Sequence, residues 1–172
     1  MKMIKTMNCV KTLLMLIGFC LASTTHGQFQ PSNDYKTAVG VRGVGTTGLT
    51  VKHFTNSNTA IEGIIGFYPN AFSVTGLVEK YQEAFETRGL NWYYGIGGHI
   101  AGQSSVVEPE GGWYRRESSA MGFGIDGIFG IEYKIYEVPI AVSFDFKPFI
   151  EIATDGDAFL ALDPGLGLKF TF

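Results

Sequence analysis

The fold of this chain is decided by its closing stretch, Pro164-Gly165-Leu166-Gly167-Leu168-Lys169-Phe170-Thr171-Phe172. Counting back from Phe172, large apolar residues occupy every second position, while threonine, lysine and glycine fill the positions between them. This period of two is typical of a β-strand with one apolar face and one polar or very small face. The alternation reaches the last residue of the sequence without a polar tail, so we expect the aromatic end itself to belong to the strand.

The same alternation continues through the rest of the chain, in segments separated by turn residues. The alternating segments are 35–44, 49–54, 61–67, 72–81, 90–101, 121–134, 140–151 and 159–172. None of them keeps the 3.6-residue period of a helix, and about eight strands of roughly ten residues match the smallest membrane barrels. Leu77 interrupts the alternation, so we expect a β-bulge there, and Gly102–Ser118 is predicted as the one long polar connection.

The two faces of the strands decide what surrounds the sheet. If the apolar face pointed inward, the narrow interior of an eight-stranded barrel would hold Trp92, Phe129, Phe144 and several more aromatic residues, and these would overfill it. With the faces reversed, glycines and paired charges fill the lumen, while aromatic and branched aliphatic residues meet lipid. We therefore predict a membrane barrel, and a soluble lipocalin-like carrier with an aromatic ligand cavity is an alternative.

The predicted fold is all-β: an eight-stranded antiparallel up-and-down transmembrane β-barrel over residues 35–172. Strands whose neighbours follow one another in sequence close in this way, and closure removes every free edge. An even strand number puts both chain ends on one side, which is the periplasmic side in barrels of this type. The connection Gly102–Ser118 then lies on the outer side.

The first 27 residues have the pattern of a secretory signal peptide. A basic start with Lys2, Lys5 and Lys11 is followed by a short apolar run and then by small and polar residues. The apolar run is too short to span a membrane as a helix, which needs about 20 residues. We predict cleavage of this segment, residues 1–27, after Gly27, with Ala22 as an alternative site.

Cleavage would leave a mature chain that begins with a short periplasmic lead, residues 28–34. Both cysteines, Cys9 and Cys20, lie in the signal peptide, so the mature chain would have neither disulfides nor thiolate metal ligands. Lipidation of Cys20 is a minor alternative, which the large Phe19 before it disfavours. Three of the 13 basic residues are removed, so the mature net charge is 10 − 16 = −6. Such an acidic chain gives no indication of nucleic-acid binding.

The closing stretch also resembles a known assembly signal. Its alternate hydrophobic residues and terminal aromatic, Leu166, Leu168, Phe170 and Phe172, resemble the C-terminal β-signal of bacterial outer-membrane proteins. The mature chain as a whole resembles the small eight-stranded OmpA/OmpX-type barrels, without a peptidoglycan-binding domain. This resemblance implies a place in the cell outer membrane of a Gram-negative envelope, recognition by the barrel-assembly machinery, and contact with outer-membrane lipid and lipopolysaccharide.

The charged residues of the polar face form the candidate functional site. We expect a network of paired charges that plugs the narrow lumen, because unpaired buried charges are costly and both signs are present. The residues predicted for this network are Arg42, Lys52, Glu62, Glu79, Asp126, Glu132, Asp145, Lys147 and Lys169. We expect no cofactor and no metal, and a narrow aqueous pore is the weaker alternative.

Three other motifs give weaker indications. Gly43–Gly48 matches the G-x-G-x-x-G spacing, but a strand follows where a dinucleotide site needs a helix, so we expect a hairpin turn. Asp155-Gly156-Asp157, with Asp163 beyond it, offers oxygen ligands to a cation but lacks EF-hand spacing, and is predicted as a solvated turn. Trp113-Tyr114-Arg115-Arg116 is predicted as an exposed loop, with contact to a partner or to lipopolysaccharide as the alternative.

His99 is the candidate for acid–base catalysis on the polar face. Small outer-membrane barrels that deacylate or palmitoylate lipid A place a histidine beside a serine and an acid, and this sequence has no His-x-Ser pairing. We expect a lumen hydrogen bond from His99 to Glu79 or Asp126 instead. The prediction is a non-enzymatic integral outer-membrane barrel with a structural or surface-interaction role, and a lipid A-modifying deacylase or acyltransferase is the alternative.

Overall fold

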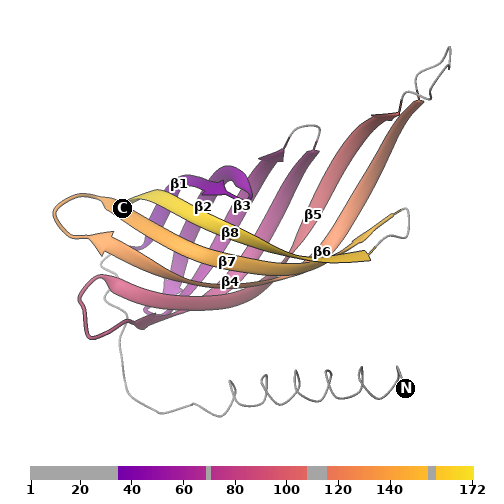
Figure 1. Cartoon of the computed structure of the whole chain (residues 1–172). Coiled ribbons are helices and arrows are strands. Elements are labelled where there is room, and N and C mark those ends of the chain that lie inside the picture. The colour runs from indigo at the N-terminus through magenta and orange to yellow at the C-terminus, as the bar shows by residue number, and fades with distance from the viewer. Residues whose placement is uncertain (1–34, 69–70, 108–115, 155–157) are drawn as a thin grey trace, which may run out of the picture.

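Eight antiparallel strands close into one barrel in the computed structural model, which describes residues 35–68, 71–107, 116–154 and 158–172 (Figure 1). The strands are β1 (Thr37–Val44), β2 (Thr47–Asn56), β3 (Thr59–Tyr68), β4 (Ala71–Glu83), β5 (Leu90–Val107), β6 (Arg116–Ile135), β7 (Ile140–Ala153) and β8 (Ala158–Thr171). Each strand pairs with its neighbours in sequence, and β8 pairs with β1. The predicted eight-stranded antiparallel up-and-down barrel is therefore confirmed. Within the described residues, no helix is long and apolar enough to cross a membrane.

The closing stretch of the sequence completes the barrel as β8. In the ladder between β1 and β8, Phe170 pairs with Val39. The Phe172 carbonyl oxygen accepts hydrogen bonds from the backbone N–H groups of Lys36 and Thr37, at 3.2 and 2.9 Å. The aromatic end therefore belongs to the sheet, as its alternation predicts.

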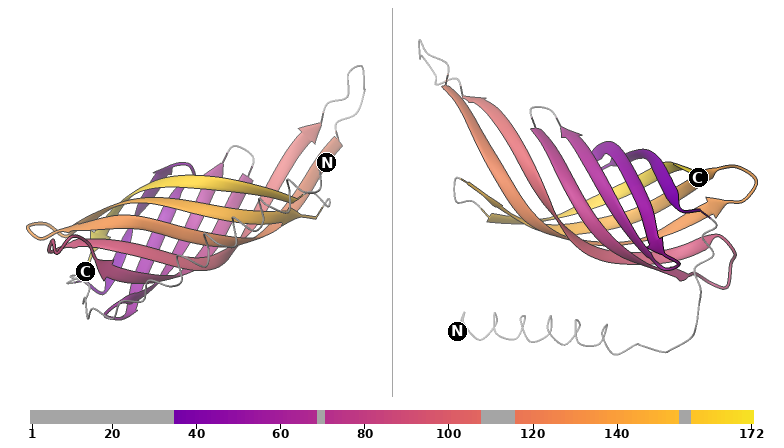
Figure 2. Two further views of the ribbon diagram at one scale, coloured as in Figure 1. Left: turned by 60° about the horizontal axis from the view of Figure 1, so that its bottom comes forward. Right: turned by 180° about the vertical axis from the view of Figure 1, so that it is seen from behind.

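The strands are staggered by ten residues around the barrel. Arg42 on β1 pairs with Gly167 on β8, and the paired residues can be followed from them around the barrel in both directions. From Arg42, the partners on β2 and β3 lead to Ser73 on β4. From Gly167, the partners on β7, β6 and β5 lead to Glu83 on the same strand, so the circuit closes with an offset of 83 − 73 = 10 residues. A stagger of this kind requires strands tilted by about 35–45° from the barrel axis, and Figure 2 shows the tilt. The tilt brings residues of distant strands to the same depth of the lumen.

The hairpin of β5 and β6 projects beyond its neighbours (Figures 1 and 2). The ladder of β5 with β4 ends at Gln103, and the ladder of β6 with β7 ends at Gly122. Beyond these positions, Ser104–Val107 pair with Arg116–Ser119 and with no other strand of the described residues. The predicted connection Gly102–Ser118 is therefore wrong in extent, because its two ends form a two-stranded ladder with each other.

Leu77 lies in a regular part of β4. It pairs with Glu62 on β3 and with Gly97 on β5, in an unbroken register. The predicted bulge is wrong because Leu77 occupies an ordinary inward position and is buried, so the inward face holds apolar as well as polar side chains. The register shift between β2 and β3 lies elsewhere, between Phe54 and Asn56.

Candidate functional site: the charged lumen

The barrel wall is apolar outside and charged inside. Exposed large hydrophobic residues on the outward positions include Val41, Leu49, Ile65, Val74, Trp92, Phe129, Phe144 and Leu168. Among the outward strand positions whose side chains the structure describes, Lys80 alone carries a formal charge. The other charged strand residues with described side chains point inward, and most of them are buried. This distribution is the reverse of the usual one in a protein surrounded by water.

Inward glycines make room for the charged side chains. A Cβ atom added to Gly165 would lie 2.6 Å from Nε of Arg42, and one added to Gly124 would lie 2.7 Å from Nε2 of His99. Both distances are too short for non-bonded atoms, so an alanine at either position would displace the neighbouring charged group. Glycine allows this close approach because it has no Cβ atom.

The first of two charge clusters surrounds Lys52. This Lys52 cluster consists of Lys52, Glu62, Glu79, Glu132 and Lys169. The Lys52 Nζ atom lies 3.0 Å from Glu62, 2.9 Å from Glu79 and 3.4 Å from Glu132. The Lys169 Nζ atom lies 3.3 Å from Glu62 and 3.4 Å from Glu132. Five strands thus contribute to one buried ion-pair network.

Three tyrosines add hydrogen bonds and ring contacts to the Lys52 cluster. The Tyr35 hydroxyl donates to Glu132 at 2.5 Å. Burial raises the pKa of the Tyr35 phenol well above its ordinary value, so Tyr35 keeps its proton. The Lys52 ammonium donates to the Tyr81 hydroxyl and lies 4.6 Å from the centroid of the Tyr93 ring. The rings of Tyr81 and Tyr93 stack 5.1 Å apart, so cation–π contacts and hydrogen bonds supplement the ion pairs.

The second cluster lies nearer to the turn between β1 and β2. This Arg42 cluster consists of Arg42, His99, Asp126, Asp145, Lys147, Glu151 and Asp163. Arg42 Nη2 lies 2.7 Å from Asp145 and 3.6 Å from Asp163. Lys147 Nζ lies 3.1 Å from Asp126 and 3.3 Å from Asp163. Asp163 also accepts hydrogen bonds from the backbone N–H and the hydroxyl of Thr46, at 2.7 and 2.6 Å, and so connects the β1–β2 turn to the cluster.

His99 lies between two carboxylates of the Arg42 cluster. Its Nδ1 atom is 2.8 Å from Asp126, and its Nε2 atom is 2.7 Å from Glu151. The Phe149 ring packs against the imidazole edge-on, with centroids 5.2 Å apart. Asp126 is one of the two partners predicted for His99, and Glu151 takes the place of the other, Glu79. Both ring nitrogens are engaged by carboxylates, so neither is available to a hydroxyl nucleophile in this arrangement.

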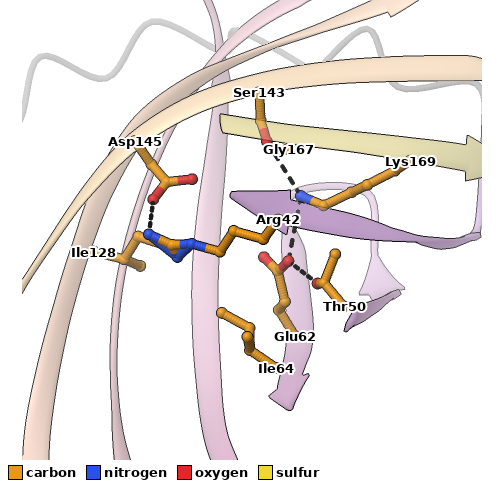
Figure 3. A pocket seen from close by; sticks show the side chains of 9 residues that line it. All are labelled: Arg42, Thr50, Glu62, Ile64, Ile128, Ser143, Asp145, Gly167 and Lys169. Atoms are coloured by element: carbon orange, nitrogen blue, oxygen red, sulfur yellow. Dashed lines mark hydrogen bonds and ion pairs between the residues drawn. The ribbon is translucent and has the colours of Figure 1, made fainter. Parts of the chain in front are cut away.

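A narrow gap lies between the two clusters (Figure 3). Its lining residues are Arg42, Thr50, Glu62, Ile64, Ile128, Ser143, Asp145, Gly167 and Lys169. The gap has no room for a water molecule. Arg42 Nε and Nη1 are buried without a hydrogen-bond partner among the residues that the structure describes. The lumen is therefore closed at this depth.

All nine charged residues predicted for the lumen lie inside the barrel, and each takes part in an ion pair of one of the two clusters. The prediction left out Asp163 and Glu151, which share an inward register with Lys169 and Asp145. Counting by two from those residues could have found both. The roles of Tyr35, Tyr81 and Tyr93 were also missed. Alternation places Tyr81 and Tyr93 on the same face as Glu79 and His99, but it does not show which charged groups of other strands they meet.

The structure also places several of the remaining predictions. The hydrophobic residues of the predicted assembly signal, Leu166, Leu168, Phe170 and Phe172, are exposed on the outer wall. Gly43–Gly48 spans the turn between β1 and β2, and a strand follows it, as predicted for a hairpin. The predictions for residues 1–34, 113–115 and 155–157 lie outside the described residues, and of Arg116 the backbone alone is described.

Within the described part of the chain, no group of three or more histidine, cysteine, aspartate or glutamate side chains is arranged to hold a metal ion. Comparisons with protein-family models, with curated proteins and with solved structures find no match to this chain. A proposal for function therefore depends on the residues and their geometry.

Proposed function

We propose that this chain is an integral outer-membrane β-barrel protein, with its lumen plugged by paired charges and with a structural or surface-interaction role. The observation that carries the proposal is the reversed distribution of the wall, which is apolar outside and charged inside. A closed barrel satisfies its backbone hydrogen bonds within the sheet, so it can span lipid where an open sheet cannot. The outer residues would then meet acyl chains.

The extent of the apolar wall argues for lipid over water. Soluble monomers rarely expose a contiguous apolar patch larger than a few hundred Å². Here exposed valine, leucine, isoleucine and aromatic side chains occupy outward positions on every strand. The same observation weakens the alternative of a lipocalin-like carrier, because Trp92, Phe129 and Phe144, which would line its cavity, face outward. The aromatic residues that do lie inside, such as Tyr81 and Tyr93, pack against buried charges.

The closed lumen argues for a plug over a pore. Ion pairs in two clusters fill the interior, and the gap between them excludes water. An eight-stranded barrel has an interior just wide enough for its own side chains. A conducting path would require the buried charges to separate, which is costly because each would lose its partner.

The projecting hairpin supports a surface-interaction role. Ser104–Val107 and Arg116–Ser119 pair with each other, beyond the ladders that β4 and β7 make with this hairpin. Among the residues that the structure describes, no strand pairs with the outer edges of this part of the hairpin, and such edges accept a further strand from another chain. The hairpin lies at the end of the barrel opposite the one where β1 begins and β8 ends (Figure 1), which is the cell exterior under this proposal.

Export and assembly complete the proposal. The predicted signal peptide would direct the chain out of the cytoplasm, and the outward residues of β8 would be recognised by the barrel-assembly machinery. After insertion, the partners of the wall would be outer-membrane lipid and lipopolysaccharide. No nucleic-acid partner and no cofactor are proposed.

Two measurements test the proposal. Detergent-extracted protein should migrate faster on a gel before boiling than after it, because a closed barrel remains compact in detergent. On cell fractionation, the protein should be recovered with the outer membrane. Recovery in the soluble periplasm, together with migration that boiling does not change, would refute the membrane placement.

A lipid A-modifying enzyme is the second candidate, and the buried His99–Asp126 pair is the observation that favours it. The occupation of both imidazole nitrogens by carboxylates argues against it. Mass spectrometry of lipid A from cells with the native chain, with His99→Ala and without the protein distinguishes the two. We expect the same lipid A profile in all three. A profile that changes with the native chain and reverts with His99→Ala would establish the enzyme.

A further inference from the structure

His99 forms a side-chain bridge across β6, on the lumen side of the barrel wall. In the two ladders of β6, His99 on β5 pairs with Gly124, and Gly124 pairs with Glu151 on β7. The imidazole and the carboxylate meet over β6 because its inward positions there are glycines. A Cβ atom added to Gly122 would lie 2.5 Å from Cδ of Glu151, and Gly124 lies under the imidazole in the same way. The sequence of β6 thus leaves a passage that the bridge fills.

The bridge needs a proton on each ring nitrogen of His99. Nδ1 lies 2.8 Å from a carboxylate oxygen of Asp126, and Nε2 lies 2.7 Å from a carboxylate oxygen of Glu151. These are hydrogen-bond distances, and an ionised carboxylate can only accept a hydrogen bond. A neutral imidazole has one N–H group and one bare nitrogen, so its bare nitrogen would face a carboxylate lone pair. The geometry therefore fits an imidazolium ring, which donates to both carboxylates.

The two carboxylates of the bridge are held unequally. The charged groups that face the ring are Asp126 from β6 and Glu151 and Lys147 from β7, while β4 places the uncharged Thr75 beside it. Asp126 is buried and has a further ion pair with Lys147, at 3.1 Å. Glu151 is partly exposed, and His99 is its one ion-pair partner among the residues that the structure describes. If the ring loses a proton, Asp126 therefore keeps a charged partner and Glu151 does not.

The bridge lies where the attachment of β7 to β6 is interrupted. The ladder between these strands has no pair at Pro148, which has no N–H group to donate. Beyond this interruption, Phe149–Ala153 form a separate stretch of five pairs with β6, at the end of the barrel that carries the projecting hairpin. The contact between His99 and Glu151 gives this end of β7 a second attachment, to β5.

We propose that His99 is a proton-dependent clasp, which fastens the hairpin end of β7 to β5 while both ring nitrogens carry protons and which releases Glu151 when one proton is lost. On release, the Glu151 carboxylate turns into water at the mouth of the lumen, and the Asp126–Lys147 pair stays in place. The Lys52 cluster, which closes the lumen deeper inside, keeps its own ion pairs. The clasp goes beyond the plug of the proposed function, because it makes the hairpin end of the barrel respond to pH.

Nitrogen-15 NMR of the full chain, folded in detergent, tests the protonation state of the ring. The His99 signals are those that are missing from the spectrum of His99→Gln. At about pH 7.5, a free histidine with a pKa of about 6.5 is mainly neutral, whereas both ring nitrogens of His99 should give the signals of protonated nitrogen. An unprotonated ring nitrogen in His99 at this pH would overturn the proposal.

The pH dependence of stability tests the clasp energetically. The folded barrel holds a ring proton that the unfolded chain releases near about pH 6.5. The contribution of His99 to stability is therefore complete below this pH and decreases as the pH rises, until the folded ring loses its proton. One such proton changes the unfolding equilibrium constant by about tenfold per pH unit. In urea titrations between about pH 7 and 8, this constant should rise about tenfold more for the native chain than for His99→Gln.

Glu151→Gln and Glu137→Gln are matched variants for the same titrations. A glutamine amide at position 151 can donate to a neutral ring, so the second ring proton is no longer needed and the rise should be about threefold smaller than in the native chain. Glu137 lies in the exposed turn between β6 and β7, at the other end of the barrel, and its substitution should leave the rise unchanged. Equal rises in the native chain, His99→Gln and Glu151→Gln would overturn the proposal. If His99→Gln does not fold, the two glutamate variants decide the outcome.

Hydrogen exchange at a single pH tests the attachment of β7. The backbone N–H groups of Phe149–Ala153 should exchange several-fold faster in His99→Gln than in the native chain. Those of Val142–Phe144, on the same strand but on the other side of Pro148, should exchange at the same rate in both. An equal effect on the two stretches, or none on either, would overturn the proposal. These measurements require a folded barrel and no membrane, so their outcome is independent of the membrane placement proposed above.

Discussion

The Nζ atom of Lys52 lies 2.9 Å from Oε2 of Glu79, and neither side chain is accessible to solvent. Burial of such a pair is favourable when further contacts satisfy both groups. Lys52 has these contacts in Glu62, Glu132 and Tyr81. With Lys169, the cluster contains two lysines and three glutamates, so each ammonium group balances more than one carboxylate.

Replacing Lys52 with methionine should therefore destabilise the barrel strongly. The substitution keeps the approximate length of the side chain but leaves three buried glutamates with Lys169 as the remaining cation of the cluster. Removing one partner of a buried ion pair typically costs about 3–5 kcal/mol. We expect the free energy of unfolding, measured by urea titration of the folded barrel in lipid vesicles, to fall by about that amount.

Lys80→Met is the matched control for this prediction. Lys80 points outward on β4 and donates a hydrogen bond to Thr59, so its loss should change the unfolding free energy by about 1 kcal/mol or less. Adding Glu79→Gln to Lys52→Met should recover part of the lost stability, because it removes one unbalanced charge. Similar losses for Lys52→Met and Lys80→Met would contradict the role given to the cluster.

A charge on the outer wall tests what surrounds the barrel. Val51 points outward near the middle of β2 and is half exposed. Arginine near the midplane of a lipid bilayer costs about 2–4 kcal/mol in a membrane barrel, whereas a surface substitution in water is usually within about 0.5 kcal/mol. We expect Val51→Arg to lower the unfolding free energy in vesicles by the larger amount and Ser57→Arg, in the β2–β3 turn, to have little effect. A small effect at both positions would indicate a wall that faces water.

Alternation in the sequence assigns residues to faces, but it does not set the register between distant strands. Sliding a strand by two residues leaves its faces unchanged and changes every partner. The pair Lys52–Glu62 lies directly across the β2–β3 hairpin, so a short turn could have predicted it. The pair Lys52–Glu132 joins β2 and β6 across the lumen. It depends on the ten-residue stagger, which emerges when all eight strands close.

Because alternation does not set the register between distant strands, it predicted one partner of His99 and not the other. Its inward direction follows from alternation within β5, and Asp126 on the adjacent β6 was one of its expected partners. Glu151 lies on β7, two strands away, and its approach depends on the tilt of the strands. The length of the β5–β6 hairpin was also underestimated, because Ser104–Val107 lack the strong apolar alternation that marks the other strands.

Replacing inward and outward strand glycines with alanine should have opposite effects on the free energy of unfolding. A Cβ atom on inward Gly130 would lie 2.5 Å from the carbonyl oxygen of Phe144, whereas one on outward Gly63 would meet nothing within 4 Å. We expect Gly130→Ala to lower the unfolding free energy by about 1–3 kcal/mol through overpacking. Gly63→Ala should be neutral or raise it by up to about 1 kcal/mol, because alanine loses less backbone freedom on folding.

The outward Gly76 and the inward Gly97 repeat the comparison on neighbouring strands. Gly76 has open space at its Cβ position, while a Cβ on Gly97 would collide with the Gly76 carbonyl oxygen. In urea titrations of all four alanine variants, the change in unfolding free energy should therefore depend on whether the glycine points inward or outward. It should not depend on which strand carries the glycine. A loss at Gly63 or Gly76 equal to that at Gly97 or Gly130 would contradict the assignment of faces.

Val44, at the end of β1, has a backbone φ of 86°, which is strained for a β-branched residue. Its side chain is largely exposed, so little packing offsets the strain. Val44→Gly should therefore raise the unfolding free energy by about 1 kcal/mol, since glycine adopts this conformation freely. Val41→Gly is the control: Val41 lies on the same strand without a positive φ, and its replacement should destabilise. Equal destabilisation by both substitutions in urea titrations would show that the backbone at Val44 stores no strain that glycine can release.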